Sequence, residues 1–514
     1  MSRDAPIQEG SQVPPADFLR EMRQSLPAEM EGFLRSTNPW WEGKPAPETP
    51  PYRRWAFNTL LRRMDIGLAP AVVLRGPRQV GKTILQRQLI GCLLSERQIE
   101  PRRIMLVRFE EIPLLNSFSA PLLAIARWFE QQVLGCSFNE AARNGKPAYL
   151  FFDEIQNQPY WAPQLKALVD NHPLKAQVTG SSALRIEAGR DSLAGRVTTI
   201  ELGTFLLREI AELRFGGTLP RLLPENGLDP LLRKEFWQEL QQHGLKNKEL
   251  RDRAFAAFSE RGGYPIAHAR AETPWPEIAA QLNETIIRRA IQHDLRSGKK
   301  GARRDQDLLE EVYRLACRYA GQSPGEDVFV KETKKALDGN IKRGRILNYL
   351  KFLDGTLLLK LVPPLELRLK RRQGNNKICL CDHGLRASWL REIIPLDEAA
   401  LAGSPQSDLA GHIAESVTGY FLASLPDLGL AHFPERGKEP EVDFVLTVGD
   451  KRIPLEVKYR RTIDPQRDTM GLCAFLEKEG YSAPFGILVT LCDGVQIADP
   501  RIVPVSLPSL LLMR

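Results

Sequence analysis

The chain has 514 residues, of which 43% are hydrophobic and 26% charged, an ordinary composition for a soluble globular protein with several domains. Its net charge of +8 permits a nucleic-acid partner without establishing one. Seven scattered cysteines argue against a disulfide framework, and the sequence shows neither a signal peptide nor the ~20-residue apolar run that a membrane span needs. We therefore expect a cytoplasmic protein without membrane insertion.

Residues 1–50 are rich in proline, glutamate and arginine, and the prolines keep any helices there short. We predict an N-terminal extension that is ordered in part by Trp40 and Trp41. A helix is predicted next, over residues 52–64. An apolar strand at 71–74 follows and leads into the strongest motif of the chain.

This motif is a phosphate-binding loop, in which Gly76 is followed by four residues and then by the run Gly81-Lys82-Thr83. The glycines let backbone N–H groups approach phosphates, Lys82 would reach the β- and γ-phosphates, and the Thr83 hydroxyl would bind Mg²⁺. A helical pattern at 84–94 would place the phosphates at a helix N-terminus, where the helix dipole favours negative charge. We predict ATP and Mg²⁺ as ligands and assign nucleotide binding to Gly76, Pro77, Arg78, Gln79, Val80, Gly81, Lys82, Thr83 and Ile84.

Four further strands are predicted in this region, at 104–109, 148–154, 177–182 and 197–202. They alternate with helical segments, which indicates an α/β fold with a parallel, doubly wound sheet and a ligand at the C-terminal edge of its strands. The strand at 148–154 is continuously apolar, as expected for burial on both faces, and it ends in Asp153 and Glu154. We predict that Asp153 holds Mg²⁺ and that Glu154 orients and deprotonates the attacking water. Thr179 and Ser181, at the tip of the next strand, would contact the γ-phosphate or this water, unless the tip is a simple turn.

These motifs resemble those of the AAA+ ATPases, and more narrowly those of a bacterial and archaeal branch with a C-terminal restriction-endonuclease-like domain of unassigned role. The motifs are GPRQVGKT, LFFDE, TGSS and LAGR before a strand, and the resemblance covers about residues 52–458. It implies that residues 179–182 form a γ-phosphate sensor. It also implies that Arg196, or its rival Arg190, reaches the nucleotide of a neighbouring subunit, so that the protein would be a homo-oligomer. A surface salt bridge is the alternative interpretation of Arg196.

The middle of the chain has mainly helical patterns. Residues 204–300 predict a helical lid with a Gly-Gly-Tyr-Pro turn. Residues 301–372 suggest a winged-helix-like module of three helices and two wing strands, at 356–361 and 365–371. The third helix carries four basic residues that would neutralise DNA phosphates, or that are solvated charges on a packing module: Lys342, Arg343, Arg345 and Lys351.

The C-terminal region contains a second group of charged residues. A strand at 441–446, a turn, and a returning strand at 453–459 would bring Asp443, Glu456 and Lys458 to one side, provided that the strand register places Asp443 on that side. Two acids can hold Mg²⁺, and a lysine beside it can position a water or stabilise charge on a phosphate. The pattern resembles that of restriction-endonuclease-like domains, with Glu415 as the helix acid. This resemblance implies Glu415, Asp443 and Glu456 as metal ligands, with Asp443, Glu456 and Lys458 as catalytic residues.

The sequence thus predicts five segments: an extension at 1–50, a nucleotide-binding core at 51–203, a lid at 204–300, a winged-helix-like module at 301–372 and a nuclease-like domain at 373–514. The expected reaction is Mg²⁺-dependent ATP hydrolysis. Three interpretations of its purpose remain open. The protein would process DNA with nuclease activity, or act as a nucleotide-gated regulator whose nuclease-like domain only binds DNA or protein, or act on protein alone.

Overall fold

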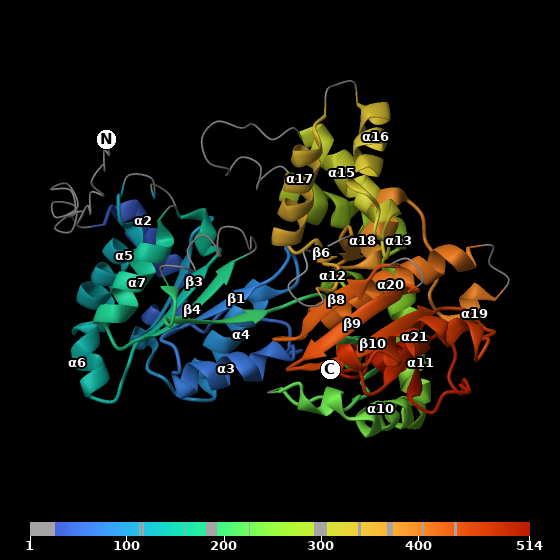
Figure 1. The fold of residues 1–514 in the computed structure, drawn as a ribbon. Coiled ribbons are helices and arrows are strands. Elements are labelled where there is room, and N and C mark those ends of the chain that lie inside the picture. Colours follow the sequence, from blue (N-terminus) through green and yellow to red (C-terminus); the bar gives the residue numbers. More distant parts are fainter. Residues whose placement is uncertain are drawn as a thin grey trace, which may run out of the picture. The chain divides into compact units, whose positions relative to one another are not determined.

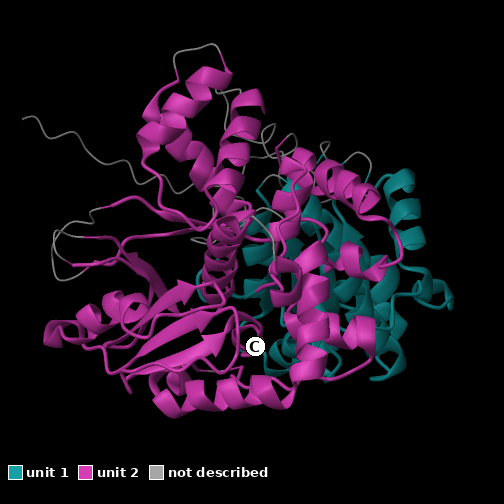
Figure 2. Cartoon of the chain, turned by 90° about the vertical axis from the view of Figure 1, so that its right-hand side faces the viewer, with its two compact units in different colours: residues 1–75, 82–180, 185–200 teal, residues 76–81, 181–184, 201–514 magenta. Residues whose placement is uncertain are grey.

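The computed structural model describes residues 26–112, 115, 118–158, 160–180, 193–225, 227–291, 306–337, 341–366, 374–402, 406–435 and 439–514 (Figure 1). The chain forms two compact units (Figure 2). The first comprises residues 1–75, 82–180 and 185–200, and the second comprises residues 76–81, 181–184 and 201–514. The segments predicted as lid, winged-helix-like module and nuclease-like domain therefore all belong to the second unit.

The first unit is built on a five-stranded sheet with the strand order β2-β3-β4-β1-β5. β1 pairs in parallel with β4, and β3 pairs in parallel with β2 and β4, which confirms the predicted parallel sheet. All five residues of β3 are buried, which explains the continuous apolar run in the sequence. The strands are β1 (Ala71–Arg75), β2 (Ile104–Arg108), β3 (Tyr149–Asp153), β4 (Lys175–Gly180) and β5 (Val197–Glu201).

Helices pack against this sheet, and the apolar core contains side chains of β1 to β4 and of α2 (Ala28–Thr37), α5 and α7. α5 continues directly into a π-helical turn at Glu130–Leu134. α6 and α7 were not predicted from the sequence. The helices are α3 (Ala56–Ile66), α4 (Lys82–Ser95), α5 (Pro121–Phe129), α6 (Phe138–Arg143) and α7 (Trp161–Asn171), with short 3₁₀ turns at Pro101–Arg103 and Ile155–Asn157.

The described part of the N-terminal extension covers β2, which lies at the edge of the sheet. It consists of α2 (Ala28–Thr37) and a 3₁₀ turn at Pro39–Glu42. Between them, the Asn38 amide donates to the Leu106 carbonyl at 2.9 Å and accepts from the Leu106 N–H at 2.7 Å. Trp40 and Trp41 both donate through Nε1 to the Ile104 carbonyl, at 3.0 and 2.8 Å. The two tryptophans thus order the extension, and polar edge groups that would otherwise be open to pairing with another chain are satisfied.

The second unit begins with helices in the region predicted as a lid. A Gly-Gly-Tyr-Pro turn at 262–265 separates α11 from α12. The helices are α9 (Leu207–Phe215), α10 (Lys234–Lys246), α11 (Lys248–Arg261), α12 (Pro265–Ala269) and α13 (Trp275–Leu282), with a 3₁₀ turn at Asp229–Leu232 and a π-helical turn at Asn283–Arg288.

Three more helices follow, and a two-stranded ribbon comes after them. The helices are α15 (Gln306–Arg318), α16 (Glu326–Ala336) and α17 (Arg343–Gly355). The ribbon pairs β6 (Leu359–Val362) with β7 (Lys377–Leu380) in antiparallel register. The first predicted wing strand, 356–361, thus overlaps β6, whose partner β7 lies beyond the predicted boundary at residue 372. Most of the second predicted wing strand, 365–371, lies outside the described residues. Several short apolar segments follow one another here, and the sequence alone does not show which of them pair.

A second five-stranded sheet forms the C-terminal part of this unit, with the order β12-β11-β10-β9-β8. β9 is antiparallel to β8 and β10, whereas β11 is parallel to β10 and β12. The strands are β8 (Gly429–Phe433), β9 (Val442–Val448), β10 (Lys451–Lys458), β11 (Gly486–Thr490) and β12 (Ile502–Ser506). The helices are α18 (His383–Leu390), α19 (Glu398–Leu401), α20 (Ser407–Ala423), α21 (Met470–Leu476) and α22 (Leu507–Leu510), with 3₁₀ turns at Arg467–Thr469 and Glu479–Tyr481.

Among the helices that the structure describes, none is both long and apolar enough to cross a membrane.

The contact between Asn38 and β2 leads to a stability prediction. Asn38→Ala should lower the free energy of unfolding by about 2 kcal/mol, because it leaves the buried N–H and C=O of Leu106 without their partner. The control is Asn171→Ala, which removes one exposed hydrogen bond to the Ala167 carbonyl and should change the free energy of unfolding little. Urea denaturation followed by fluorescence measures both variants. Equal unfolding midpoints for the two would show that the extension does not stabilise the sheet edge.

Candidate functional site

The predicted phosphate loop connects the end of β1 to the start of α4. Gly81 has a φ of +92°, a conformation that glycine adopts without strain, and Gln79 has a φ of +63°. At Gly76, an added Cβ would lie 2.1 Å from the carbonyl oxygen of Leu202. At both glycines of the motif, a side chain would therefore be unfavourable: it would clash at Gly76 and strain the backbone at Gly81.

Lys82 and Thr83 open α4 and face two acids at the end of β3. The Thr83 hydroxyl lies 3.2 and 3.1 Å from the two carboxylate oxygens of Asp153. Lys82 is only 4% exposed, and its ammonium lies 3.7 Å from the Glu154 carboxylate. Residues 70 positions apart in the sequence are therefore in contact, as the motif predicts.

Thr179, on the neighbouring strand β4, contacts both acids. Its hydroxyl donates to Asp153 and accepts from the backbone N–H of Glu154 at 2.9 Å. Thr179 is fully buried. That it touches the γ-phosphate or the attacking water stays a prediction; in the structure its hydroxyl bonds to Asp153 and to the Glu154 backbone.

Glu154 leaves the strand in a left-handed backbone conformation, with φ 50° and ψ 47°. This turn separates its side chain from that of Asp153, and the Gln156 side-chain amide donates to the Glu154 carboxylate. Left-handed backbone at a non-glycine residue is uncommon and is often found at functional sites. Sequence reasoning did not identify Gln156, although its position two residues after the predicted base was a signal.

The residues that converge here fit a magnesium ion and a nucleotide. Asp153 is 5% exposed, and burial raises the pKa of its carboxyl above the usual range, with Glu154 acting in the same direction. A buried carboxylate of this kind gains stability from a cation beside it. A hydroxyl and a carboxylate facing each other are oxygen ligands of the type that Mg²⁺ binds through few protein groups.

The other residues predicted to contact the nucleotide differ in their exposure and in their contacts. Ile84 is 42% exposed, whereas Val80 is buried. The Arg196 guanidinium forms an ion pair with Asp170 through Nε and Oδ1 at 2.9 Å, which is the salt-bridge geometry that was its alternative interpretation. Arg190 and Ser181 lie outside the described residues, as does Ser182.

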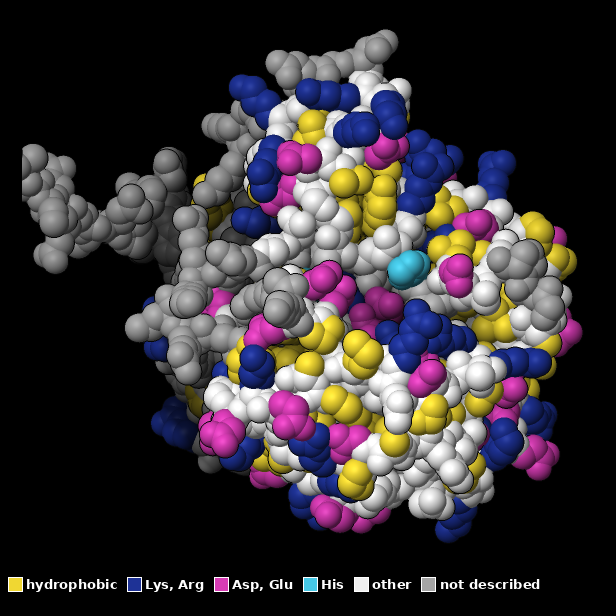
Figure 3. All heavy atoms as spheres, turned by 45° about the vertical axis from the view of Figure 1, so that its right-hand side comes forward, with side chains coloured by type: hydrophobic (Ala, Val, Ile, Leu, Met, Phe, Trp, Pro, Cys, Tyr) yellow, Lys and Arg dark blue, Asp and Glu magenta, His cyan; other side chains and the backbone are white. Residues whose placement is uncertain are grey.

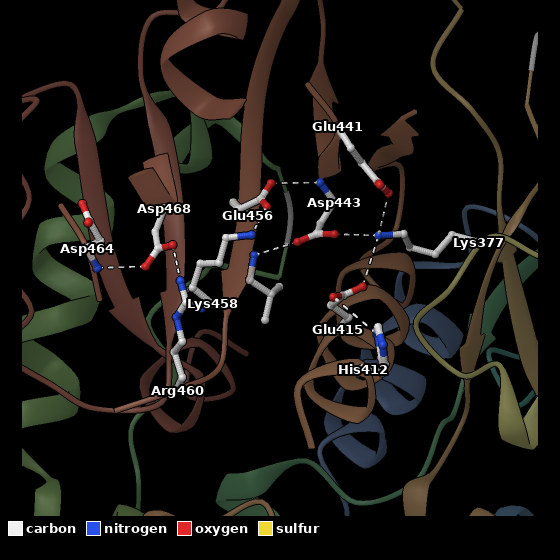
Figure 4. A network of polar contacts seen from close by, with 11 residues as sticks. Lys377, His412, Glu415, Glu441, Asp443, Glu456, Lys458, Arg460, Asp464 and Asp468 are labelled. Carbon is white, nitrogen blue, oxygen red and sulfur yellow. Dashed lines mark hydrogen bonds and ion pairs between the residues drawn. The ribbon is translucent and has the colours of Figure 1, made fainter. Parts of the chain in front are cut away.

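The second predicted group of residues lies on β9 and β10 (Figure 4). The antiparallel register places Leu455 opposite Phe444 and therefore Glu456 opposite Asp443. The Asp443 N–H donates to Glu456 Oε2 at 3.3 Å, and Lys458 Nζ lies 2.6 Å from Glu456 Oε1. The structure thus brings Asp443, Glu456 and Lys458 together on one side of the sheet, which the sequence left undecided.

Figure 4 shows a lysine at the centre of these acids that sequence reasoning missed. Lys377, the first residue of β7, is 1% exposed. Its ammonium lies 2.7 Å from Asp443 Oδ1, 3.3 Å from Glu415 Oε2 and 3.7 Å from Glu441 Oε1. The signal in the sequence was a single lysine at the start of a short, otherwise apolar strand.

The pKa values in this group follow from burial and from the two lysines. Burial raises the pKa of Glu415 well above its usual range, and burial together with the Asp443 charge raises the pKa of Glu456 to about 8. Burial acts against ionisation of Asp443 too, but Lys377 outweighs it and holds the Asp443 pKa below the usual range. Asp443 and Lys377 therefore form the charged pair at the centre of the group.

The predicted metal ligands Glu415, Asp443 and Glu456 do converge, but around an ammonium group. Within the described part of the chain, no three His, Cys, Asp or Glu side chains are placed so that they could hold a metal ion. Cys379 and Cys381, on and next to β7, are buried and free.

Comparison with known proteins agrees with the geometry of the first unit. Residues 69–211 match the family of the AAA domain, and this segment contains the phosphate loop, both acids of β3 and Thr179. The match supports an AAA-type P-loop ATPase. A second segment, residues 252–394, matches a domain of unknown function (DUF8612). Neither matched segment includes Asp443, Glu456 or Lys458.

The curated relatives are themselves uncharacterized. An uncharacterized protein of Methanocaldococcus jannaschii is 24% identical over 385 residues, which are 73% of this chain and 72% of that protein. Uncharacterized proteins of Mycobacterium bovis and Mycobacterium tuberculosis are each 25% identical over 258 residues, or 49% of this chain. The match covers half the length of each mycobacterial protein.

The segment of unknown function begins and ends on elements that touch each other. The Asp382 carboxylate, at the N-terminus of α18, accepts from the backbone N–H of Gly263 at 2.5 Å and from that of Leu385 at 3.0 Å. An added Cβ at Gly262 would lie 2.3 Å from Asp382. The Gly-Gly-Tyr-Pro turn is therefore bonded to the start of α18.

The close approach at Gly76 leads to a prediction with a matched glycine control. Gly76→Ala should weaken ATP binding about tenfold or more, because the new Cβ would meet the backbone oxygen of Leu202 and the loop would have to move. Gly91→Ala in α4 has no atom within 4 Å of the new Cβ and should raise stability by up to about 1 kcal/mol. A fluorescent ATP analogue measures binding. Equal affinity in both variants would contradict the assignment of the loop.

Proposed function

We propose that the protein hydrolyses ATP in a Mg²⁺-dependent reaction at the N-terminal end of α4. The observation that carries this proposal is the convergence of Lys82, Thr83, Asp153 and Glu154 from two elements. The Thr83 hydroxyl lies within 3.2 Å of both Asp153 oxygens, and Lys82 Nζ lies 3.7 Å from Glu154. The match of residues 69–211 to the AAA domain supports the same activity.

Each residue has a distinct task in this proposal. Lys82 neutralises the β- and γ-phosphates, and Thr83 and Asp153 would hold Mg²⁺, which offsets the phosphate charge that develops during transfer. Glu154 accepts a proton from the attacking water. Thr179 fixes Asp153 and the Glu154 backbone, and the Gln156 amide orients the Glu154 carboxylate.

The two charged residues have separable roles. Lys82→Ala should abolish ATP binding or turnover, because it removes the lysine that would reach the β- and γ-phosphates. Glu154→Gln should retain ATP and Mg²⁺ binding and lower kcat by about 10²- to 10⁴-fold, since an amide cannot accept the water's proton. Phosphate release and binding of a fluorescent ATP analogue measure the two effects.

Lys146→Ala, a change at an exposed lysine of the same unit, is the control and should leave both quantities unchanged. Unchanged turnover in Lys82→Ala would end the proposal. Loss of nucleotide binding in Glu154→Gln with turnover retained would show that the roles of Asp153 and Glu154 have been exchanged.

We also propose that nucleotide binding is coupled to a nucleic-acid partner, most directly DNA. The observation that favours it is the surface of α16 and α17. Lys and Arg side chains gather on this helical module (Figure 3), and seven of them are exposed: Lys331, Lys334, Lys335, Lys342, Arg343, Arg345 and Lys351. Two of them form ion pairs, Arg343 with Glu326 and Lys335 with Glu332, and both of these pairs lie at exposed cations.

The α17 surface provides a direct test of DNA binding. Replacing Lys342, Arg345 and Lys351 by Gln should weaken duplex DNA binding and lower the slope of log affinity against log salt by about 2 to 3, because each lost phosphate contact removes about 0.9 from the slope. The control replaces Arg102, Arg143 and Lys146 by Gln, which removes equal charge from exposed positions of the first unit. Fluorescence anisotropy at several salt concentrations measures both.

If the two triple variants lose affinity equally, the binding is unspecific electrostatic attraction. If the parent chain does not bind DNA, the partner is a protein, and the exposed cations are solvated charges. In either case the ATPase proposal stands unchanged, because it rests on Lys82, Thr83, Asp153 and Glu154, which are remote in sequence from α16 and α17.

A further inference from the structure

We propose that Lys377 is the resident cation of the carboxylate cluster formed by Glu415, Asp443 and Glu456, and that it replaces a divalent metal there. The sequence pattern predicted a Mg²⁺ site at these three acids. The structure places a buried ammonium group at the position from which a metal would contact two of them (Figure 4). This proposal is independent of ATP hydrolysis.

Three elements hold the ammonium in place. Lys377 starts β7, Glu415 lies on α20 and Asp443 lies on β9. Lys377 Nζ is 2.7 Å from Asp443 Oδ1 and 3.3 Å from Glu415 Oε2, and it lies 5.0 Å from the centre of the Phe444 ring. The side chain is therefore fixed by two carboxylates and by the face of an aromatic ring, an arrangement that favours a cation.

The carboxylate oxygens that a metal would need already have partners. Asp443 Oδ1 binds Lys377, and its Oδ2 accepts from the Val457 N–H at 2.9 Å. Glu456 Oε1 binds Lys458 at 2.6 Å, and its Oε2 accepts from the Asp443 N–H at 3.3 Å. A divalent ion requires contacts of about 2.0–2.6 Å to such oxygens, so it would have to displace these bonds.

Displacing Lys377 is costly because the residue has nowhere nearby to be solvated. Lys377 is 1% exposed, and moving a charged ammonium group into an apolar environment without partners costs much free energy. A second cation placed beside it would be repelled at short range. The site thus holds one monovalent cation supplied by the chain.

The experiment removes the ammonium and asks whether a metal enters. Nucleotide-free full-length Lys377→Met should bind one more equivalent of Mn²⁺ than the parent chain, measured by electron paramagnetic resonance of free Mn²⁺. Adding Asp443→Asn to Lys377→Met should abolish that equivalent. Lys451→Met, at an exposed lysine of the same sheet, should bind as the parent does.

A second measurement covers the case in which Lys377→Met folds poorly, because it leaves buried acids without their partner. Mn²⁺ should then raise the melting temperature of Lys377→Met by several degrees and leave that of the parent chain unchanged, since only a folded state with a metal site is stabilised by the ion. Lys377→Arg keeps the positive charge and should behave as the parent does.

An Asp443-dependent Mn²⁺ ion in the parent chain would overturn the proposal. So would a Lys377→Met chain that neither binds Mn²⁺ nor gains stability from it. Measuring ATP turnover in the same samples separates this outcome from a failure of the ATPase proposal, because Lys377 belongs to the second unit and Lys82 to the first.

Discussion

The burial of Asp153 is the constraint on which the nucleotide site depends. A carboxylate that is 5% exposed must be compensated, and two threonines from different elements contact it. Thr83 brings the start of α4 to the acid, and Thr179 joins it to the neighbouring strand. The Thr179 hydroxyl also accepts from the Glu154 N–H, so the residue that satisfies the buried charge also holds the backbone of the proposed base.

The second unit solves the same physical problem in a different way. Asp443 is also buried at a strand, but its nearest cation is the ammonium of Lys377 and not a site open to a metal ion. Both sites resemble metal sites when only their acids are read from the sequence. What distinguishes them is the group opposite the carboxylate, which is a hydroxyl in the first case and a lysine in the second.

The group opposite each buried carboxylate, a hydroxyl at Asp153 and a lysine at Asp443, bears on what each unit does. An ATPase with a lysine-neutralised carboxylate cluster fits a nucleotide-gated regulator better than a metal-dependent nuclease. The exposed cations on α16 and α17 are the observation that favours a nucleic-acid partner for that regulator.

The sequence by itself determined the features that depend on neighbouring residues: the glycine spacing of the phosphate loop, the apolar strand ending in Asp153 and Glu154, and the parallel sheet. These follow from local backbone geometry and from burial on both faces of a strand. Only the tertiary structure decided the partner of β6, the contacts of Thr179 and the entry of Lys377 into the acid cluster. Lys377 and Asp443 are 66 positions apart, and a contact over that distance depends on which strands pair and in what register, which local patterns do not encode.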